Sequence, residues 1–411
     1  MRAIGAVRRA ERALVVILGA SIPVSIALDN VLLGLIAALW LCGGAWRDKL
    51  RAIAASPVAL AALALFGWLA LGMGWSQGSP ADRVEYLGKY KELAFVALLL
   101  WPFADRATRT RALIAFGGAC AVTLAASYAL HFGLIAPNNL LQGNAANPVA
   151  FKLQITHNIL MAAAAFLFAS YAAYAARPAR RWTCAGLALA AVYNVLFMVR
   201  GRTGYLMLFV LLLLFVTARW RWRGFAVGLV ASVMLFGIAY QGSETFQRRV
   251  TQAFVELAAA SPERPAAYND SVGLRLEFYR NTAAIVAEHP LLGVGTGGFP
   301  AAYADKVRGS GRELTRNPHN EYLLIASQSG LVGLALFIAL LALQWRAAAR
   351  LAGGLERDLA RGLVLAMALG CLTNSLLLDH TEGLYYAWLS ALLFGGPAAP
   401  AAATPEGGDA G

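Results

Sequence analysis

The sequence predicts an all-α polytopic membrane protein with about twelve transmembrane helices and one large helical loop outside the membrane. Of its 411 residues, 59% are hydrophobic and only 14% are charged, whereas about 25% of the residues of a soluble domain are charged. The mean hydropathy is +0.59. A bilayer core needs roughly 20 mostly apolar residues per helical crossing, and the chain contains twelve apolar blocks. This composition excludes the soluble globular, collagen-like, disordered and disulfide-scaffold classes.

The apolar blocks divide the chain into four predicted parts. Residues 1–240 would hold spans one to nine, 241–318 the outer loop, 319–396 spans ten to twelve, and 397–411 a disordered cytoplasmic tail of small residues and prolines. The twelve blocks lie near residues 13–28, 31–46, 58–74, 93–104, 112–134, 158–176, 183–199, 203–218, 223–240, 320–345, 359–378 and 384–396.

The basic residues predict the orientation. With the N-terminus in the cytoplasm, 20 of the 35 Lys and Arg residues fall at six alternate cytoplasmic positions, and six fall in the short loops on the other side. This asymmetry is typical of multi-pass proteins, and it places both termini in the cytoplasm. The net charge of +13 then reflects topology, so it gives no reason to expect a nucleic-acid partner.

The outer loop is 78 residues long, and loops of this length without a role are uncommon. It contains a predicted amphipathic helix at 244–259 and a second at 271–288, which Ser271 could cap and Pro290 would end. A glycine-rich turn follows, and the chain returns to the membrane at His319. We expect this loop to cap the outer mouth of the bundle.

Two arginines, Arg200 and Arg202 in the run RGRTGY, lie at the predicted outer boundary of the eighth span. Cations at a helix N-terminus oppose the helix dipole, at a cost of about 0.3–1 kcal/mol each. The arrangement becomes favourable when an anion binds, because guanidinium and backbone N–H groups converge on it. We therefore predict an anion site, which Gly201 and Gly204 would open to a ligand. The alternative is a pair of interfacial arginines that reach to lipid headgroups.

Four further cations on the predicted outer side are candidates for ligand binding. Lys89 and Lys91 form a basic pair ahead of the fourth span, where they can bind substrate or meet headgroups. Arg275 lies on the second loop helix and has no acidic residue three or four positions away. Arg280 can pair with Glu277 at a spacing of three. Arg275 is therefore the better candidate for a ligand.

His319 is the predicted general base, because it lies in the run NPHNEY where the loop re-enters the membrane. A neutral imidazole near pH 7 is the usual proton acceptor in enzymes. Capping of the tenth span is the alternative explanation for a polar helix start. The sequence has no Asp-x-Asp motif and no GxxxxGK motif, so a metal-dependent nucleotide-sugar transferase and a P-loop enzyme are both disfavoured.

One motif in this region resembles a known family. The run His319-Asn320, nine residues, Gly330, two residues, Gly333 is similar to the signature of O-antigen ligases. Arg202 followed after three residues by a leucine resembles the family's second marker. The segment 288–299 (EHPLLGVGTGGF) resembles the wider group of O-antigen ligases, O-antigen polymerases and protein O-oligosaccharyltransferases.

The resemblance implies an enzyme of the bacterial inner membrane that acts on the periplasmic face. Its substrates would be an undecaprenyl-diphosphate-linked glycan and lipid A-core, within the lipid bilayer. No cofactor and no metal are implied, and we expect a monomer. The loop 241–318 would be periplasmic.

The resemblance also assigns roles to residues of this sequence. His319 and Arg202 match the two markers, and Arg275, Lys89 and Lys91 carry over beside them. The predicted catalytic residues are therefore His319, Arg202 and Arg275. The predicted substrate-binding residues are Arg200, Lys89, Lys91, Asn320 and Tyr322. We expect Arg200, Arg202 and Arg275 to hold the diphosphate. His319 would deprotonate the acceptor hydroxyl, in one displacement that inverts the anomeric centre.

Other functions stay open at this point. An O-antigen polymerase would pass the glycan to a second carrier-linked repeat; such enzymes commonly have two sizeable outer loops, whereas residues 135–157 here are short. A protein O-oligosaccharyltransferase would use a Ser or Thr acceptor. A secondary transporter would keep ionisable residues within its spans, but nearly all charges of this chain lie at predicted span boundaries.

Overall fold

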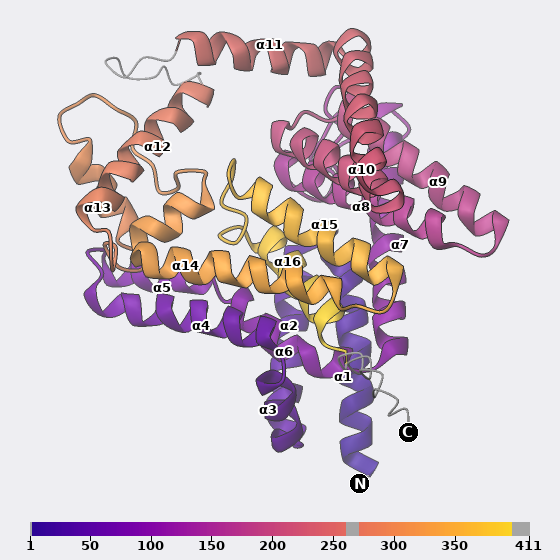
Figure 1. The fold of residues 1–411 in the computed structure, drawn as a ribbon, viewed down its shortest axis with the longest axis horizontal. Helices are drawn as coiled ribbons and strands as arrows, with labels where there is room; N and C mark the ends of the chain where they lie inside the picture. Colours follow the sequence, from indigo (N-terminus) through magenta and orange to yellow (C-terminus); the bar gives the residue numbers. More distant parts are fainter. Residues whose placement is uncertain (1, 260–270, 397–411) are drawn as a thin grey trace, which may run out of the picture.

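The computed structural model describes residues 2–259 and 271–396, and in these ranges the chain forms helices and no strand (Figure 1). The all-α class is therefore confirmed. The predicted tail at 397–411 lies outside the described residues. The helices are α1 (Arg2–Ser21), α2 (Ile26–Cys42), α3 (Trp46–Ala54), α4 (Pro57–Gly72), α5 (Pro80–Lys89), α6 (Glu92–Phe103), α7 (Arg106–His131), α8 (Gln154–Tyr174), α9 (Pro178–Tyr193), α10 (Arg202–Gly242), α11 (Glu244–Ala259), α12 (Ser271–Glu288), α13 (Phe299–Lys306), α14 (Glu321–Ala349), α15 (Gly354–Gly370) and α16 (His380–Phe394).

Short polar residues determine where several helices begin. The Ser56 hydroxyl accepts a hydrogen bond from the backbone N–H of Ala59, and Pro57 occupies the first turn of α4. Asp105 caps α7 in the same way, with its carboxylate 2.9 Å from the N–H of Thr108. These side chains satisfy N–H groups that the helix leaves without an internal partner.

Six helices are long and apolar enough to cross a membrane, and a seventh span results if α2 and α3, bent by 114°, are counted as one. The six are α4 with the turn after it, α7, α8, α9 with the turn after it, α10 and α14. Helices α6, α15 and α16 have 12, 17 and 15 residues, fewer than the roughly 20 needed for one crossing. The described helices coincide with the predicted apolar blocks, but the count of twelve crossings is not confirmed.

Helix α10 is a helical hairpin. Its 41 residues include two with non-helical backbone angles, Trp220 and Arg221. The rings of Phe209 and Phe236 lie 6.1 Å apart, whereas 27 residues of straight helix would separate them by about 40 Å. The chain therefore reverses at Trp220, and the two halves correspond to the predicted blocks at 203–218 and 223–240.

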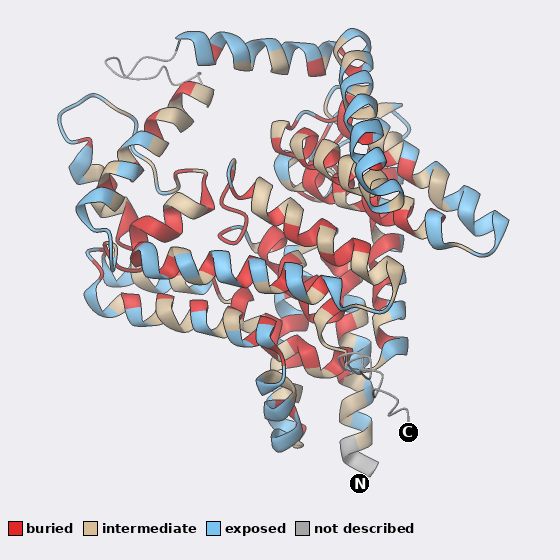
Figure 2. Ribbon diagram, viewed as in Figure 1, coloured by how far each residue is buried: buried red, intermediate tan, exposed pale blue. Residues whose placement is uncertain are grey.

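The core lies where α1, α6 and α16 meet. Helix α16 packs on α6, and α14 packs on α4. The Trp388 side chain is completely buried, and its indole N–H donates to the Val15 carbonyl at 3.0 Å. A Cβ at Gly19 would lie 2.5 Å from the Trp388 ring, so α1 approaches α16 closely only because that position is glycine. Figure 2 shows buried residues concentrated in α14, α15 and α16.

The described parts of the segment between α10 and α14 form three helices that lie to one side of the bundle (Figure 1). Helices α11 and α12 match the predicted helices at 244–259 and 271–288. Helix α12 ends at Glu288, as Pro290 predicts. Helix α12 packs against α14, and α11 joins α10 to α12. These helices therefore bring the loop residues over the start of α14, which follows His319.

Candidate functional site

His319 lies immediately before α14 in the left-handed backbone conformation, with φ of 56°. This conformation costs a residue other than glycine of the order of 1–3 kcal/mol. Its N–H donates to the Asn317 side-chain oxygen at 2.8 Å, and the Ser375 hydroxyl donates to the same oxygen at 2.7 Å. The Tyr279 hydroxyl donates to the His319 carbonyl at 3.0 Å. Elements far apart in sequence thus hold His319 in a strained position, which is typical of a functional residue.

The His319 ring is oriented for proton transfer. Its Nδ1 lies 3.3 Å from the Asn374 side-chain oxygen. An amide oxygen only accepts hydrogen bonds, so Nδ1 carries the proton and Nε2 presents a lone pair. Burial lowers the pKa of His319, the charge of Arg275 lowers it further, and the hydrogen bond to Asn374 opposes both effects. The imidazole is therefore neutral at pH 7.

Arg275 is the cation beside this histidine. It is half-buried, and burial lowers its pKa, as does the nearby charge of Arg202. In the part of the chain that the structure describes, its guanidinium forms no ion pair and no hydrogen bond. The Tyr279 hydroxyl and the Glu256 carboxylate act on it only from a distance. Arg275 thus keeps its five N–H donors for a ligand.

Arg202 begins α10 and lies close to Arg275. One of its terminal nitrogens, Nη1, contacts the Glu256 carboxylate at 3.4 Å and the Ser271 hydroxyl at 2.9 Å. Its Nε and Nη2 are buried and have no hydrogen-bond partner among the described residues. Buried donors are nearly always satisfied in folded proteins. Two open donors at the N-terminus of a helix, next to a second guanidinium, are the arrangement that binds a phosphate.

Glu256 on α11 connects these elements, and sequence reasoning missed it. Its carboxylate accepts from the N–H of Val272 at 3.0 Å, so it caps α12. The hydroxyl of the predicted cap, Ser271, instead accepts from Arg202 and donates to Glu256. The contacts join positions up to 70 residues apart, so no local pattern in the sequence indicates them.

The two arginines of the RGR run lie in different surroundings. The backbone N–H of Arg200 donates to the Asn147 side chain at 3.2 Å, and its side chain lines a separate cavity beside the first half of α11. The flanking glycines pack against Asn158 in α8: a Cβ at Gly201 would lie 2.3 Å from the Asn158 amide nitrogen, and one at Gly204 would lie 2.6 Å from the Asn158 Cβ. Close helix packing explains these glycines, and the expectation that they open a ligand site is wrong.

Asn320 and Tyr322 both have partners within the protein. The Asn320 side-chain oxygen caps α14 by accepting from the Leu323 N–H at 3.0 Å, and its amide nitrogen donates to the Leu372 carbonyl at 3.0 Å. The Tyr322 hydroxyl donates to the Ala368 carbonyl at 2.7 Å. These contacts tie α14 to α15, so both residues support the position of His319.

Lys89 and Lys91 lie on another part of the surface. Both line a cavity of about 270 Å³ together with Glu92 and His380. Lys89 forms an ion pair with Glu85 at 2.9 Å, and His380 contacts Glu92 at 2.9 Å. No contact joins this lysine pair to Arg202, Arg275 or His319 in the described residues.

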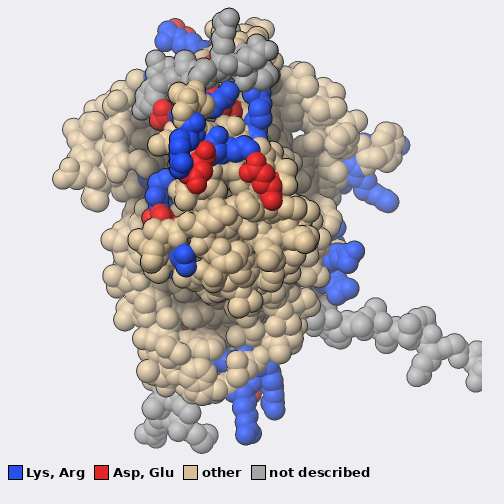
Figure 3. Space-filling view, turned by 90° about the vertical axis from the view of Figure 1, so that its left-hand side faces the viewer, with Lys and Arg blue, Asp and Glu red and all other residues tan. Residues whose placement is uncertain are grey.

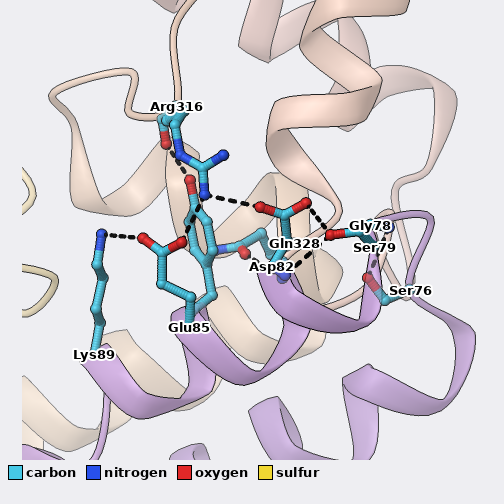
Figure 4. Close-up of polar contacts among 10 residues, drawn as sticks. Ser76, Gly78, Ser79, Asp82, Glu85, Lys89, Arg316 and Gln328 are labelled. Atoms are coloured by element: carbon cyan, nitrogen blue, oxygen red, sulfur yellow. Dashed lines mark hydrogen bonds and ion pairs between the residues drawn. The ribbon is translucent and has the colours of Figure 1, made fainter.

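A cluster of charges fixes the segment that leads to His319 (Figure 4). Arg316 Nη2 lies 2.8 Å from both Asp82 and Glu85 on α5, and the Tyr86 hydroxyl donates to the Arg316 carbonyl. Hydrogen bonds lower the pKa of both carboxyl groups. The largest effect on Asp82 comes from Ser79, and the largest effect on Glu85 comes from Lys89. Asp82 and Glu85 are three positions apart on a predicted outer segment. This acidic pair is the sequence pattern that could have indicated a contact with a cation.

The glycines of the ligase-like signature have a structural explanation. Helix α14 is interrupted at Gly330, which has φ of +66°. A Cβ there would lie 1.9 Å from the Leu291 carbonyl. The neighbouring Gln328 accepts from the N–H of Gly297 at 2.7 Å. The glycine-rich turn after α12 therefore packs into the break in α14, and this packing holds α12 next to His319.

Basic residues gather on the face that carries this site. In Figure 3, Lys and Arg side chains cluster with a few carboxylates in the upper half, and the broad area below is almost free of charge. Ion pairs on this side include Arg312 with Glu277 at 3.0 Å and Lys306 with Glu288. Glu277 thus contacts Arg312, a partner that its helical spacing does not predict. The described residues include no group of three or more His, Cys, Asp or Glu that could hold a metal ion.

Comparison with known families decides the relationship. Residues 185–338 match the family described as O-Antigen ligase. Over this stretch the chain is similar to O-antigen ligases. The match confirms the predicted resemblance at the level of the O-antigen ligase and polymerase superfamily. The matched stretch begins in α9 and ends in α14, so it includes Arg202, Arg275 and His319, whereas Lys89 and Lys91 lie before it.

The remaining comparisons add little. No curated protein matches the chain. It is similar to a solved chain described under structural coordination of polymerization and crosslinking by a peptidoglycan synthase complex, with 19% identity and a TM-score of 0.49, covering 83% of this chain and 96% of that chain. A likeness at this level carries no argument about the activity of this chain.

Proposed function

We propose that this chain is a glycosyltransferase that moves a glycan from undecaprenyl diphosphate to a sugar hydroxyl of lipid A-core. The observation that carries the proposal is the group formed by His319, Arg202 and Arg275. It combines a neutral imidazole with a free Nε2, two buried guanidinium donors without a partner, and a second guanidinium that is not neutralised. The superfamily match indicates a lipid-linked glycan as substrate.

The donor brings the negatively charged partner that these arginines lack in the free protein. A diphosphate leaving group gains negative charge as its bond to the sugar breaks. Preorganised donors aimed at that charge are worth roughly 2.7–4 kcal/mol each in the transition state. Arg202 and Arg275 would supply this stabilisation without a metal ion. Arg200 lies apart from them, so we leave it out of the diphosphate site.

The acceptor chemistry follows from the tautomer of His319. The acceptor hydroxyl oxygen attacks the anomeric carbon and forms the new glycosidic bond. The bond from that carbon to the diphosphate oxygen breaks, and its electron pair leaves with the diphosphate. Nε2 of His319 takes the hydroxyl proton, while Asn374 holds the ring through Nδ1. A single displacement of this kind inverts the anomeric configuration.

The proposal includes the cellular setting. The enzyme would be a multi-pass protein of the bacterial inner membrane, with both termini in the cytoplasm and with α11, α12 and α13 in the periplasm. It would act as a monomer, without a cofactor. The area of Figure 3 that is almost free of charge and the six apolar helices support the membrane setting.

The choice of acceptor is tested with purified protein in detergent. The protein is given an undecaprenyl-diphosphate glycan together with lipid A-core, a second carrier-linked repeat unit or a serine-rich pilin peptide, each with and without EDTA. We expect product on lipid A-core that persists in EDTA. Lengthened carrier-linked glycan would instead identify a polymerase, and glycosylated peptide would identify a protein O-oligosaccharyltransferase.

A further inference from the structure

A second basic cavity, of about 500 Å³, lies along the first half of α11 and does not include His319. Its wall is built from the end of α7, the turn at Ala145 and Ala146, the end of the π-helical segment Asn194–Met198, and the first half of α11. The polar residues that line it include His131, Arg200, Glu244, Arg248, Arg249 and Gln252.

The charges in this cavity are not balanced. Three arginines face one carboxylate, and that carboxylate, Glu244, is paired with Arg248. The guanidinium groups of Arg200 and Arg249 form no ion pair and no hydrogen bond within the described ranges. His131 adds a polar ring whose Nδ1 lies 3.0 Å from the Ala145 carbonyl. Because a carbonyl only accepts, Nδ1 carries the proton, and Nε2 is left to accept a hydrogen bond from a sugar hydroxyl.

The cavity is separate from the diphosphate site but close to it. Gln252 lines the cavity and donates to Glu256 at 2.6 Å, and Glu256 in turn contacts Arg202. Arg200 and Arg202 are two positions apart in sequence, so their Cα atoms are at most about 7 Å apart. An anion in the cavity would therefore lie near the reacting sugar without displacing the diphosphate.

We propose that this cavity binds a phosphate group carried on the acceptor sugars, through Arg200 and Arg249. Planar guanidinium forks match phosphate geometry and bind it bidentately. The polar side chains of the lining suit the hydroxyl groups of a glycan, and Phe197 and Met198 give its rings an apolar surface to pack against. This inference rests on the proposed transferase function for the identity of the acceptor, and it gives Arg200 a role in acceptor choice.

The test compares lipid A-core with the same glycolipid after phosphatase treatment. Binding is measured by native mass spectrometry, and transfer is measured separately with the undecaprenyl-diphosphate donor. The variants are Arg249→Gln and Arg200→Gln, with Arg308→Gln as the matched control, since Arg308 is exposed and pairs only with Asp305. Losing one charge-assisted contact weakens binding by about tenfold or more. We therefore expect at least that rise in Kd and KM for the phosphorylated acceptor. The KM of the donor and the binding of the dephosphorylated acceptor should not change.

The outcomes separate this inference from the proposed function. Wild-type protein that binds both forms of the glycolipid equally would overturn the cavity assignment, even if transfer is observed. Arginine-dependent binding without transfer would support the cavity and contradict the proposed function. A further arm uses nanodiscs of phosphatidylcholine with and without phosphatidylglycerol. If Arg249→Gln changes only the retention of phosphatidylglycerol, the site binds a lipid headgroup and the acceptor assignment is overturned.

Discussion

Replacing Arg275 by glutamine should separate function from stability. Arg275 has no partner for its guanidinium in the described structure, and burial already lowers its pKa. Burying an unsatisfied polar group costs about 1–3 kcal/mol, and more for a charged one. Arg275→Gln replaces the charge by a neutral amide and so removes part of this cost, and we expect the free protein to gain about 1 kcal/mol of stability. The same change removes one transition-state donor and should slow transfer by about 10²–10³-fold.

The assay measures both quantities on one preparation. Transfer is followed as kcat and KM with the undecaprenyl-diphosphate donor, and stability as Tm in the same detergent without substrate. Arg280→Gln is the matched control, because Arg280 lies on the same helix and is exposed. We expect that control to keep its transfer rate. The reasoning is refuted if Arg275→Gln transfers normally, or if its Tm falls in step with its activity.

Further predictions concern the histidine and the loop that carries it. The transfer rate should rise with pH along an acid limb whose midpoint lies below the ordinary histidine value of about 6.5, because the pKa of His319 is lowered and only the neutral ring accepts a proton; a midpoint above that value would contradict this. Arg275→Gln should move that limb to higher pH, because it removes a positive charge that lowers the pKa of His319. Asn374→Asp keeps an acceptor for Nδ1 but adds a negative charge, so the acid limb should also move to higher pH. Asn374→Leu should lower kcat by about tenfold or more with little change in KM. Equal pH profiles for the two variants would argue against a positioning role of Asn374. Arg316→Gln should lower the free energy of unfolding by no more than about 1 kcal/mol per ion pair, yet it should speed hydrogen exchange in residues 309–318. Unchanged exchange would mean that the contact does not hold the loop.

Local sequence patterns predicted most of the helices. The separate apolar blocks at 203–218 and 223–240 predicted two spans, and α10 does reverse between them. Pro290 and the apolar periodicity predicted both helices of the outer segment. The number of crossings could not be settled in this way, because α6, α15 and α16 are shorter than a bilayer span but still apolar. Packing against longer helices, which sequence periodicity does not report, decides where such helices lie.

The site was predicted in part. His319, Arg202 and Arg275 come together, although they lie up to 117 positions apart in the chain. Their supporting contacts, from Asn374 and Glu256, depend on which helices become neighbours, and no sequence spacing encodes that. Arg200 was grouped with Arg202 because the two are adjacent in sequence. A side chain two positions away can face a different cavity, and Arg200 does so.

The most direct test of the account is transfer by the His319→Ala variant in the presence of EDTA. Purified wild-type protein, His319→Ala and Arg280→Gln are compared in single-turnover reactions with the lipid-diphosphate donor and lipid A-core. A general base contributes about 10²–10⁴-fold, so we expect His319→Ala to be at least 100-fold slower than the other two proteins. Transfer by His319→Ala at the wild-type rate would contradict the proposed role of His319 and the mechanism built on it.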